Sequence, residues 1–371
     1  MYTDISEPVY DAWLASSAMP ARLLMEIYNQ YGKASNCYDA FLNHGKEIDT
    51  FIPSRFYRIL EQNSSEQFLS QMKKSMGRND IQVLHMHDTQ YPDSLKSICD
   101  PPPLLFYQGD LTCLKEKMVA MVGSRVASYI GQKAAEKIAE ALSHHGVSVI
   151  SGLACGIDAA SHRGCLLGSS PTIAVTGCGL DRVYPVDNGP LRNEILDKNG
   201  LILSEYAPGE RPLGWHFPVR NRIISGLAHA LVLIEARIRS GSMTSVQHAL
   251  DQGKDVFVYP GDPSSDHFEG NHQLLREGGL YFTSAEDILE DLGWLDNPPA
   301  VRHNIDCSLE QSSATKEQSA VIQALKPGSL SFEQLLKITD LNPSVLMSTL
   351  TILQISGLIE ALPGKQYQLN Q

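Results

Sequence analysis

The chain has 371 residues, with 30 basic and 42 acidic side chains, a formal net charge of −12 and a pI near 5.4. Hydrophobic residues make up 43% and charged residues 19%, a balance that excludes disorder over most of the chain and predicts two or three folded domains. The acidic balance also argues against a protein that coats nucleic acid through bulk charge, because such proteins are usually basic.

Neither a membrane span nor a secretory signal is expected. No apolar run approaches the roughly 18 to 20 residues that a bilayer requires, and the N-terminus has no basic stretch before an apolar segment. The seven cysteines are scattered and form no Cys-x-x-Cys pair, so a disulfide framework and a zinc site are not expected either. We therefore expect a cytoplasmic protein.

Residues 1–75 predict a helical domain. Apolar side chains recur at helical spacing in 21–32, in 56–62 and in 65–74. An extended connector follows, with a predicted strand at 81–85 and a segment at 100–110 whose three consecutive prolines forbid a helix.

Residues 76–295 predict an extended Rossmann-like domain, an α/β fold with a doubly wound, mostly parallel sheet. Apolar β-rich runs recur every 25 to 30 residues with helix-like stretches between them, and their lack of strict alternation is typical of strands buried on both faces. The predicted strands are 118–122, 147–151, 172–176, 201–205, 230–235 and 255–259, with a weaker one at 279–282.

The rest of the chain predicts a polar linker over 296–314 and a winged-helix-like domain over 315–371, from the order helix, helix, helix, hairpin. The third of these helices, within 344–357, has no charged residue, whereas a helix that reads duplex DNA presents Arg, Lys, Asn or Gln to base edges. We expect an interaction or accessory module there.

Gly- and Ser-rich turns follow five of the predicted strands. In an open parallel sheet the carboxyl ends of the strands meet at one rim, where helix N-termini offer free N–H groups to a ligand. The turns are 123–125, 151–158, 176–179, 240–242 and 260–262. Any one of them serves as a simple connection. Together they indicate a binding site.

Local charge indicates that the ligand is a polyanion. Between 211 and 242 the chain carries five arginines and Glu235 as its only acid, and Arg125 lies in the first Gly-rich turn. Trp215 and Phe217 stand beside these arginines, an interleaving that favours single-stranded nucleic acid because unpaired bases stack on aromatic rings. Two alternatives stay open: that both rings are core residues, and that Arg222 forms a structural ion pair with Glu235.

Signatures of catalysis are missing. The chain has no Gly-x-Gly-x-x-Gly turn, no P-loop and no Gly-x-Ser-x-Gly elbow, so we expect no catalytic residue, no cofactor and no metal. The histidines are expected on helix surfaces or in the core, and two aspartates that follow Gly-rich turns are expected to be helix caps or loop anchors. These residues are His162, His216, His229 and His248, with Asp158 and Asp181.

Several segments resemble the DprA/Smf family of DNA-processing proteins. The resemblance extends from about Tyr91 to Trp294 and is carried by VGSR (122–125), SGLACGIDAASHRG (151–164), FPVRNRIISGLAHALVLIEA (217–236) and SGSMTSVQHALDQGKDVFVYPG (240–261). It implies an extended Rossmann domain that binds single-stranded DNA, a homodimer formed through that domain, and loading of the RecA recombinase during natural transformation. It also implies a helical N-terminal module of sterile-alpha-motif or helix-hairpin-helix type and a C-terminal winged helix.

The resemblance implies the DNA-binding residues as well. They are Gly123, Ser124 and Arg125 in the phosphate-binding turn, Phe217, Arg220, Asn221 and Arg222 in the strand-contacting segment, and Ser240, Gly241 and Ser242 in the adjoining loop. The chain departs from the family pattern at Gly214, where some members have Lys, and at Cys155, where Arg is common.

Two other functions are alternatives to single-stranded DNA binding. A nucleotide-processing enzyme of the lysine-decarboxylase-like phosphoribohydrolase type requires a Gly-Gly-x-Gly-Thr-x-x-Glu loop, but residues 240–246 have neither the second glycine pair nor the glutamate. A protein-interaction scaffold that has lost DNA binding is the third reading, because of Gly214 and Cys155.

Overall fold

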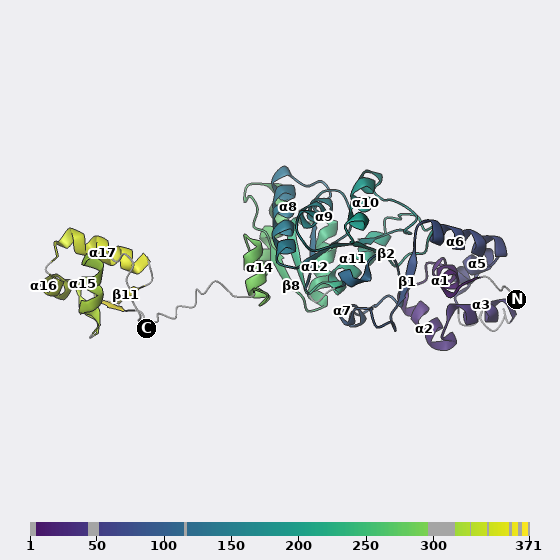
Figure 1. The fold of residues 1–371 in the computed structure, drawn as a ribbon, viewed down its shortest axis with the longest axis horizontal. Coiled ribbons are helices and arrows are strands. Elements are labelled where there is room, and N and C mark those ends of the chain that lie inside the picture. The colour runs from purple at the N-terminus through teal and green to yellow at the C-terminus, as the bar shows by residue number, and fades with distance from the viewer. Residues whose placement is uncertain are drawn as a thin grey trace. The chain divides into compact units, whose positions relative to one another are not determined.

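The computed structural model describes residues 5–43, 52–114, 117–295, 316–326, 328–339, 341–355, 358–362 and 366–369 (Figure 1). The chain divides into two compact units, Met1–Leu295 and Asp296–Gln371. The predicted linker lies outside the described residues, and the predicted boundary near residue 75 stays a prediction. Among the described residues, no helix combines the length and the apolarity needed to cross a bilayer.

A nine-stranded sheet forms the centre of the first unit, in the order β1-β2-β6-β5-β4-β3-β7-β8-β9. Neighbours from β6 to β9 are parallel, and β2 and β1 add antiparallel strands at one edge. This confirms the predicted doubly wound, mostly parallel sheet. The strands are β1 Gln82–His85, β2 Leu104–Gly109, β3 Met118–Gly123, β4 Ser148–Ser151, β5 Thr172–Thr176, β6 Leu201–Ser204, β7 Ala230–Glu235, β8 Asp255–Val258 and β9 Leu280–Tyr281.

Both faces of the central strands are buried. On β3 the side chains of Ala120 and Val122 enter one core, while Val119 and Met121 enter the core on the opposite face. Alternate side chains of a strand point to opposite faces, so a strand covered on both sides must be apolar at every position. Burial on both faces therefore explains why these strands are unbroken apolar runs in the sequence.

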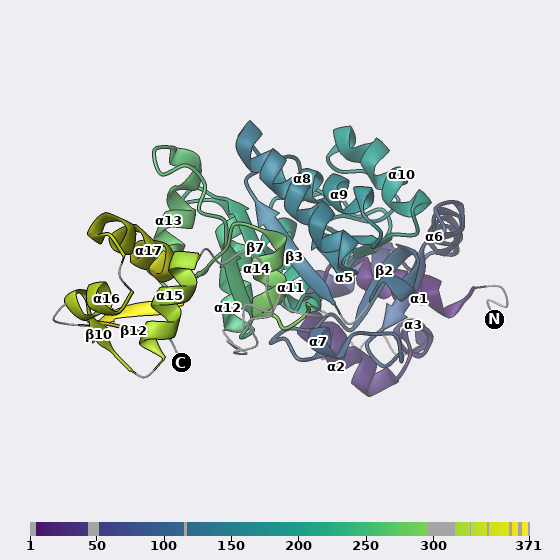
Figure 2. The ribbon, with the colours of Figure 1, turned by 60° about the vertical axis from the view of Figure 1, so that its left-hand side comes forward.

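Helices cover the sheet in two layers (Figure 2). α8, α9, α10 and α14 lie on one face, and α7, α11, α12 and α13 lie on the other. Their bounds are α7 Asp93–Lys96, α8 Tyr129–His144, α9 Ile157–Leu167, α10 Gly189–Asp197, α11 His216–Leu227, α12 Gly241–Asp251, α13 Glu269–Arg276 and α14 Ala285–Asp291, with short 3₁₀ turns at Leu111–Cys113, Val186–Asn188 and Asp266–Phe268.

The chain reverses its direction of winding between β3 and β7. After β3 it builds β4, β5 and β6 on one side, and it then crosses to build β7, β8 and β9 on the other. β3 and β7 are parallel neighbours, so a crevice opens beyond their carboxyl ends, where ligands of doubly wound sheets bind.

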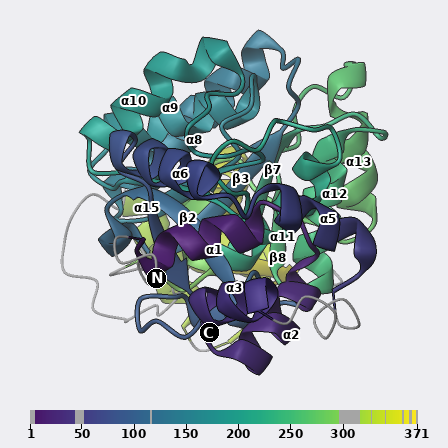
Figure 3. The same ribbon diagram turned by 90° about the vertical axis from the view of Figure 1, so that its right-hand side faces the viewer.

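The N-terminal helices gather beside β1, at one edge of the sheet (Figure 1), and several of them lie toward the viewer in Figure 3. They are α1 Glu7–Ala15, α2 Ala21–Tyr31, α3 Ala34–Asn43, α5 Ser54–Gln62 and α6 Glu66–Arg78. Their core is centred on the fully buried Trp13, whose indole N–H donates to the carbonyl of Leu60 at 3.2 Å. The same core includes sheet residues such as Phe106 and Ile202, so it is continuous with that of the sheet.

The second unit is a winged-helix domain, as predicted. It contains α15 Lys316–Leu325, β10 Leu330–Ser331, α16 Phe332–Thr339, α17 Pro343–Ile355, β11 Ile359–Leu362 and β12 Gln366–Leu369. The strands form an antiparallel sheet in the order β10-β12-β11. Its separate core includes Val321, Leu335, Leu346 and Leu350.

Candidate functional site

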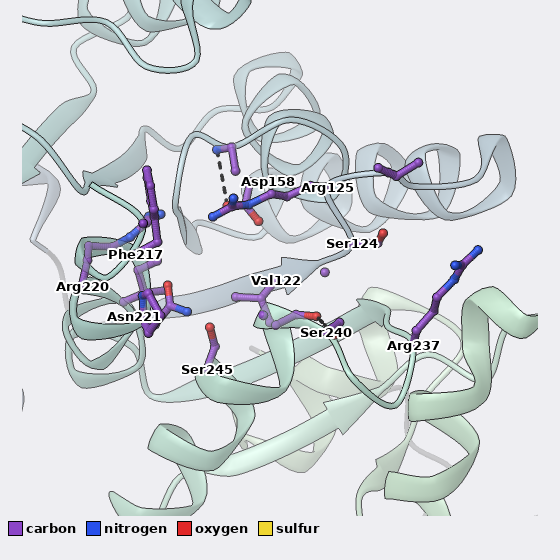
Figure 4. A pocket seen from close by; sticks show the side chains of 18 of the residues that line it. Val122, Ser124, Arg125, Asp158, Phe217, Arg220, Asn221, Arg237, Ser240 and Ser245 are labelled. Atoms are coloured by element: carbon purple, nitrogen blue, oxygen red, sulfur yellow. Dashed lines mark hydrogen bonds between the residues drawn. The ribbon is translucent and has the colours of Figure 1, made fainter. Parts of the chain in front are cut away.

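A cavity of about 700 Å³ opens at the carboxyl ends of β3 and β7, where the winding of the sheet reverses (Figure 4). All the predicted DNA-binding residues except Arg222 line it. They are Gly123, Ser124, Arg125, Phe217, Arg220, Asn221, Ser240, Gly241 and Ser242. These residues come from segments up to 119 positions apart in the chain, and the topology of the sheet brings them together.

The turn after β3 is fixed by its neighbours. The amide of Ser124 donates to the carbonyl of Glu235 at the end of β7, and the carbonyl of Ser124 accepts from the amide of Ile157 at the start of α9. Gly156 has a φ of +77°, and a Cβ there would lie 2.2 Å from the Ser124 carbonyl oxygen. Glycine is therefore required for the loop after β4 to pass beneath this turn.

Arg220 is buried in the wall of the cavity, with 3% of its surface exposed. One terminal nitrogen donates to the carbonyl of Val175, while Nε has no partner among the described residues. The guanidinium fits because residue 152 is glycine, where a Cβ would lie 2.1 Å from Nη1. Burial lowers the pKa of Arg220 to about 10 and Asp158 opposes this, so the group remains a cation at neutral pH.

Two aromatic rings and a guanidinium meet at the mouth of the cavity. The guanidinium carbon of Arg125 lies 4.8 Å from the centre of the Phe217 ring, a cation–π contact. The Tyr184 ring lies 5.4 Å from Phe217 at an interplanar angle of 34°. Phe217 is half-buried and Tyr184 is 42% exposed, so both offer ring surface to a ligand. Tyr184 was missed from the sequence, although it is an aromatic residue beside a Gly-rich turn.

The charge of the lining is mainly positive. Arg125, Arg220 and Arg237 line the cavity, and Asp158 is the only carboxylate among the described lining residues. Asp158 accepts from the amide of Ala154 at 3.4 Å, as expected of a loop anchor, and burial raises its pKa while Arg220 lowers it. The sequence pointed to Arg237 only as one of the five arginines of the positively charged segment 211–242.

The N-terminus of α12 completes the lining. Ser240 precedes the helix, and its hydroxyl lies 2.6 Å from the hydroxyl of Ser242. The first N–H groups of a helix lack intrahelical partners and carry a partial positive charge, so this end of α12 also favours an anion. Among the described lining residues, none of those from α12 is a glutamate, the residue that the phosphoribohydrolase reading requires.

Arg222 does not reach the cavity. Its guanidinium makes two bonds to the carboxylate of Glu205, at 2.6 and 2.9 Å, and Nε donates to the carbonyl of Asp100 at 2.9 Å. Successive residues of a helix are rotated by about 100°, so Arg222 points away from the side of α11 that Arg220 occupies.

The alternative that Arg222 forms an ion pair with Glu235 is wrong, because Arg222 pairs with Glu205. The carboxylate of Glu235 instead accepts from the amide of Ser128 at 3.0 Å and contacts Nδ1 of His267 at 3.0 Å. Glu235 therefore holds the start of α8.

The alternative that Trp215 is a core residue is also wrong, because 53% of its surface is exposed. Its neighbour His216 is fully buried, with Nδ1 3.1 Å from the carbonyl oxygen of Gly177, and burial lowers its pKa. His162 is fully buried as well, and burial lowers its pKa to about 3. Both are core histidines that stay neutral near pH 7.

The comparisons with known proteins agree with this architecture. Residues 82–293 match the family described as DNA recombination-mediator protein A, and residues 309–365 match the DprA winged helix domain. DNA processing protein DprA of Streptococcus pneumoniae is 46% identical over 204 residues, which cover 55% of this chain and 72% of that protein.

Two solved structures are similar. The X-ray structure of DprA from Streptococcus pneumoniae superposes with a TM-score of 0.65 at 36% identity and covers 76% of this chain and 97% of that one. DNA processing protein A from Helicobacter pylori, from a study of its single-stranded DNA binding mode, has a TM-score of 0.52 at 29% identity, covering 58% of this chain and 97% of that one. The chain belongs to the DprA/Smf family, the DNA recombination-mediator protein A family.

Proposed function

We propose that the cavity binds single-stranded DNA, and that the protein protects incoming DNA and loads the RecA recombinase onto it during natural transformation and recombination. The observation that carries the proposal is the guanidinium of Arg220, which is buried in the cavity wall and whose Nε has no partner among the residues that the structure describes. A buried donor that no protein group satisfies is costly, and a phosphate oxygen in the cavity would satisfy it.

The lining suits a strand backbone. Arg125 and Arg237 are exposed and Arg220 is buried, so the three cations line the cavity at different depths. Guanidinium groups and backbone N–H groups match the geometry of phosphate oxygens, and such contacts hold a strand without reading its sequence.

The aromatic surface favours one strand over two. Phe217 and Tyr184 offer ring faces at the cavity mouth, and bases can stack on them only when they are not already stacked in a duplex. The Helicobacter pylori relative is described by its single-stranded DNA binding mode, which supports the same ligand for this chain.

The remaining parts of the proposal come from the family. They are a homodimer formed through the Rossmann domain, action in the cytoplasm, RecA as the protein partner, and a role without catalysis. RecA loading is tested by the rate of RecA filament formation on single-stranded DNA with and without the protein; no acceleration would contradict it.

The ligand class is tested with matched oligonucleotides. Fluorescence anisotropy with single-stranded and duplex forms of one sequence should show clearly tighter binding of the single strand. Equal affinity for the two forms would contradict the stacking argument, and release of a free base from nucleoside monophosphates would favour the phosphoribohydrolase reading instead.

A further inference from the structure

Two largely exposed loops, 181–186 and 209–215, contribute Tyr184, Pro212 and Gly214 to the cavity lining, and together they are here called the outer ridge. They are bonded to each other: the amide of Gly209 donates to the carboxylate of Asp181 at 2.7 Å, and Nε of Arg182 donates to the carbonyl of Gly209 at 3.1 Å. The amide of Gly179, just before the first loop, donates to the carbonyl of Glu210 at 3.1 Å. These hydrogen bonds hold the two loops of the outer ridge together.

Trp215 stands at the end of the outer ridge next to the cavity, since its neighbours Gly214 and Phe217 both line it. One side of the indole packs edge-on against the rings of His216 and Tyr206, with centroids 4.1 and 6.4 Å away. Those two rings are buried, whereas more than half of the Trp215 surface faces solvent. The indole is therefore held in place by buried rings on one side and offers its remaining surface to a ligand.

Cations accompany the exposed rings. Arg182 and Arg211, one from each loop, are exposed. Each loop also carries one carboxylate: Asp181 accepts from the Gly209 amide, and Glu210 lies 3.9 Å from Nε2 of the buried His216. Among the described residues neither carboxylate forms an ion pair with Arg182 or Arg211, so the terminal nitrogens of both guanidinium groups can meet phosphates. Tyr184, also on the ridge, contacts Phe217 and so joins the ridge to the cavity.

We propose that the outer ridge is a second contact for the same DNA strand. A base of the strand leaving the cavity stacks on Trp215, and its phosphates lie against Arg182 and Arg211. Rings alternating with cations form the pattern by which single strands are held without sequence preference. This inference rests on the proposed function and extends its site by several nucleotides.

The test uses the full chain and oligothymidylates of about 4 and about 15 nucleotides. Trp215→Ala should weaken binding of the longer strand by roughly 5- to 150-fold, the loss expected for one stacked base, and should leave the shorter strand's affinity unchanged. Trp215→Phe should restore most of the affinity, whereas Trp215→Leu, which keeps apolar volume without a ring, should not. Leu167→Ala, at a leucine that is 62% exposed and does not line the cavity, is the matched control.

Intrinsic fluorescence gives an independent readout. Of the three tryptophans, Trp13 is fully buried and Trp294 is half-buried against His229, so quenching by the longer strand should come from Trp215 and vanish in Trp215→Phe.

The outcomes separate the two proposals. If the wild type binds both strands but Trp215→Ala binds the longer one normally and no quenching occurs, the ridge contact is refuted and the cavity stands. If Trp215→Ala changes the oligomeric state in light scattering and not the DNA affinity, the ridge is a protein interface. If the wild type binds neither strand, the proposed function itself fails.

Discussion

Arg220 and Arg222 stand two positions apart on α11 and have opposite surroundings. Arg220 faces the cavity, and its Nε has no partner in the part of the chain that the structure describes, whereas Arg222 is held between the carboxylate of Glu205 and the carbonyl of Asp100. The first is arranged to meet a ligand, and the second fixes α11 to the segment that precedes β2.

This difference predicts a stability effect at Arg222. Arg222→Ala leaves the carboxylate of Glu205, whose side chain is 11% exposed, without its cation, and breaking a buried pair costs about 3–5 kcal/mol. Thermal denaturation should show a large fall in Tm. Arg125→Ala, at an exposed position, is the control and should unfold like the wild type. A wild-type Tm for Arg222→Ala would contradict the structural role.

Gly214 offers a gain-of-function test. It lines the cavity, and a Cβ at this position would meet nothing within 4 Å. Gly214→Lys should therefore fold normally and add a phosphate contact, which steepens the slope of log affinity against log salt by about 0.7. Gly214→Gln, of similar length and without charge, should leave the slope unchanged. An unaltered slope for the lysine variant would argue that the strand does not pass this residue.

For single residues, the sequence predicts which residue types form the site, but it does not predict which way each side chain points. The Gly-Ser-Arg turn and the arginine-rich segment are recognisable in the sequence, and all the predicted DNA-binding residues except Arg222 line the cavity. Which of Arg220 and Arg222 faces the ligand depends on the orientation of α11, which packing against the rest of the fold decides. Tyr184 was not predicted because its contact with Phe217 joins a loop to α11, and the two residues are 33 positions apart in the chain.

Among the elements, the strands of the parallel sheet were predicted best, because each is a short apolar run buried on both faces. β2 was predicted only as an extended segment, since the prolines before it obscure a strand that pairs antiparallel with β1 and β6. α1 gives no amphipathic pattern because residues 9–15 are all buried.

A polar cluster joins the N-terminal helices to the sheet. Asp11 of α1 is fully buried, accepts from the hydroxyl of Tyr28 of α2 at 2.7 Å, and lies 3.0 Å from Nε2 of His85 on β1. The hydrogen bond to Asp11 raises the pKa of His85, against the effect of burial. His85 thus ties the helices to the edge of the sheet, and this contact with the carboxylate is stronger when the imidazole is protonated.

This cluster predicts a pH-dependent stability. Because the folded pKa of His85 is raised, its contribution is complete below the unfolded value of about 6.5 and is lost as pH rises through the folded value. His85→Gln should therefore lower the free energy of unfolding by roughly 1 kcal/mol more at pH 5.5 than at pH 8.5. His87→Gln, at an exposed histidine two residues away, should show no such difference. An equal loss at both pH values for His85→Gln would contradict the assignment.

For the whole molecule, a net charge of −12 and a DNA ligand are compatible because the charges are unevenly placed. The described residues that line the cavity include three arginines and one carboxylate. The acidic excess lies elsewhere, which favours binding at the cavity over binding across the surface.

The division of the chain into two units predicts how removal of the winged-helix domain affects DNA binding. Every described residue that lines the cavity belongs to Met1–Leu295, whose hydrophobic cores are separate from that of the winged-helix domain. A chain ending at Leu295 should keep the single-strand affinity of the full chain within a few fold. A loss of binding by a truncated protein that still unfolds cooperatively would show that the winged-helix domain supplies part of the site.

The most direct test of the cavity as a strand site is the salt dependence of single-strand affinity, measured by anisotropy between 50 and 200 mM salt for the wild type and Arg125→Ala. With about four phosphates neutralised, the wild type should lose roughly fiftyfold in affinity over this range. Arg125→Ala should bind more weakly at every salt concentration, and its slope should be smaller by about 0.7. Salt-insensitive binding, or a variant indistinguishable from the wild type, would contradict it.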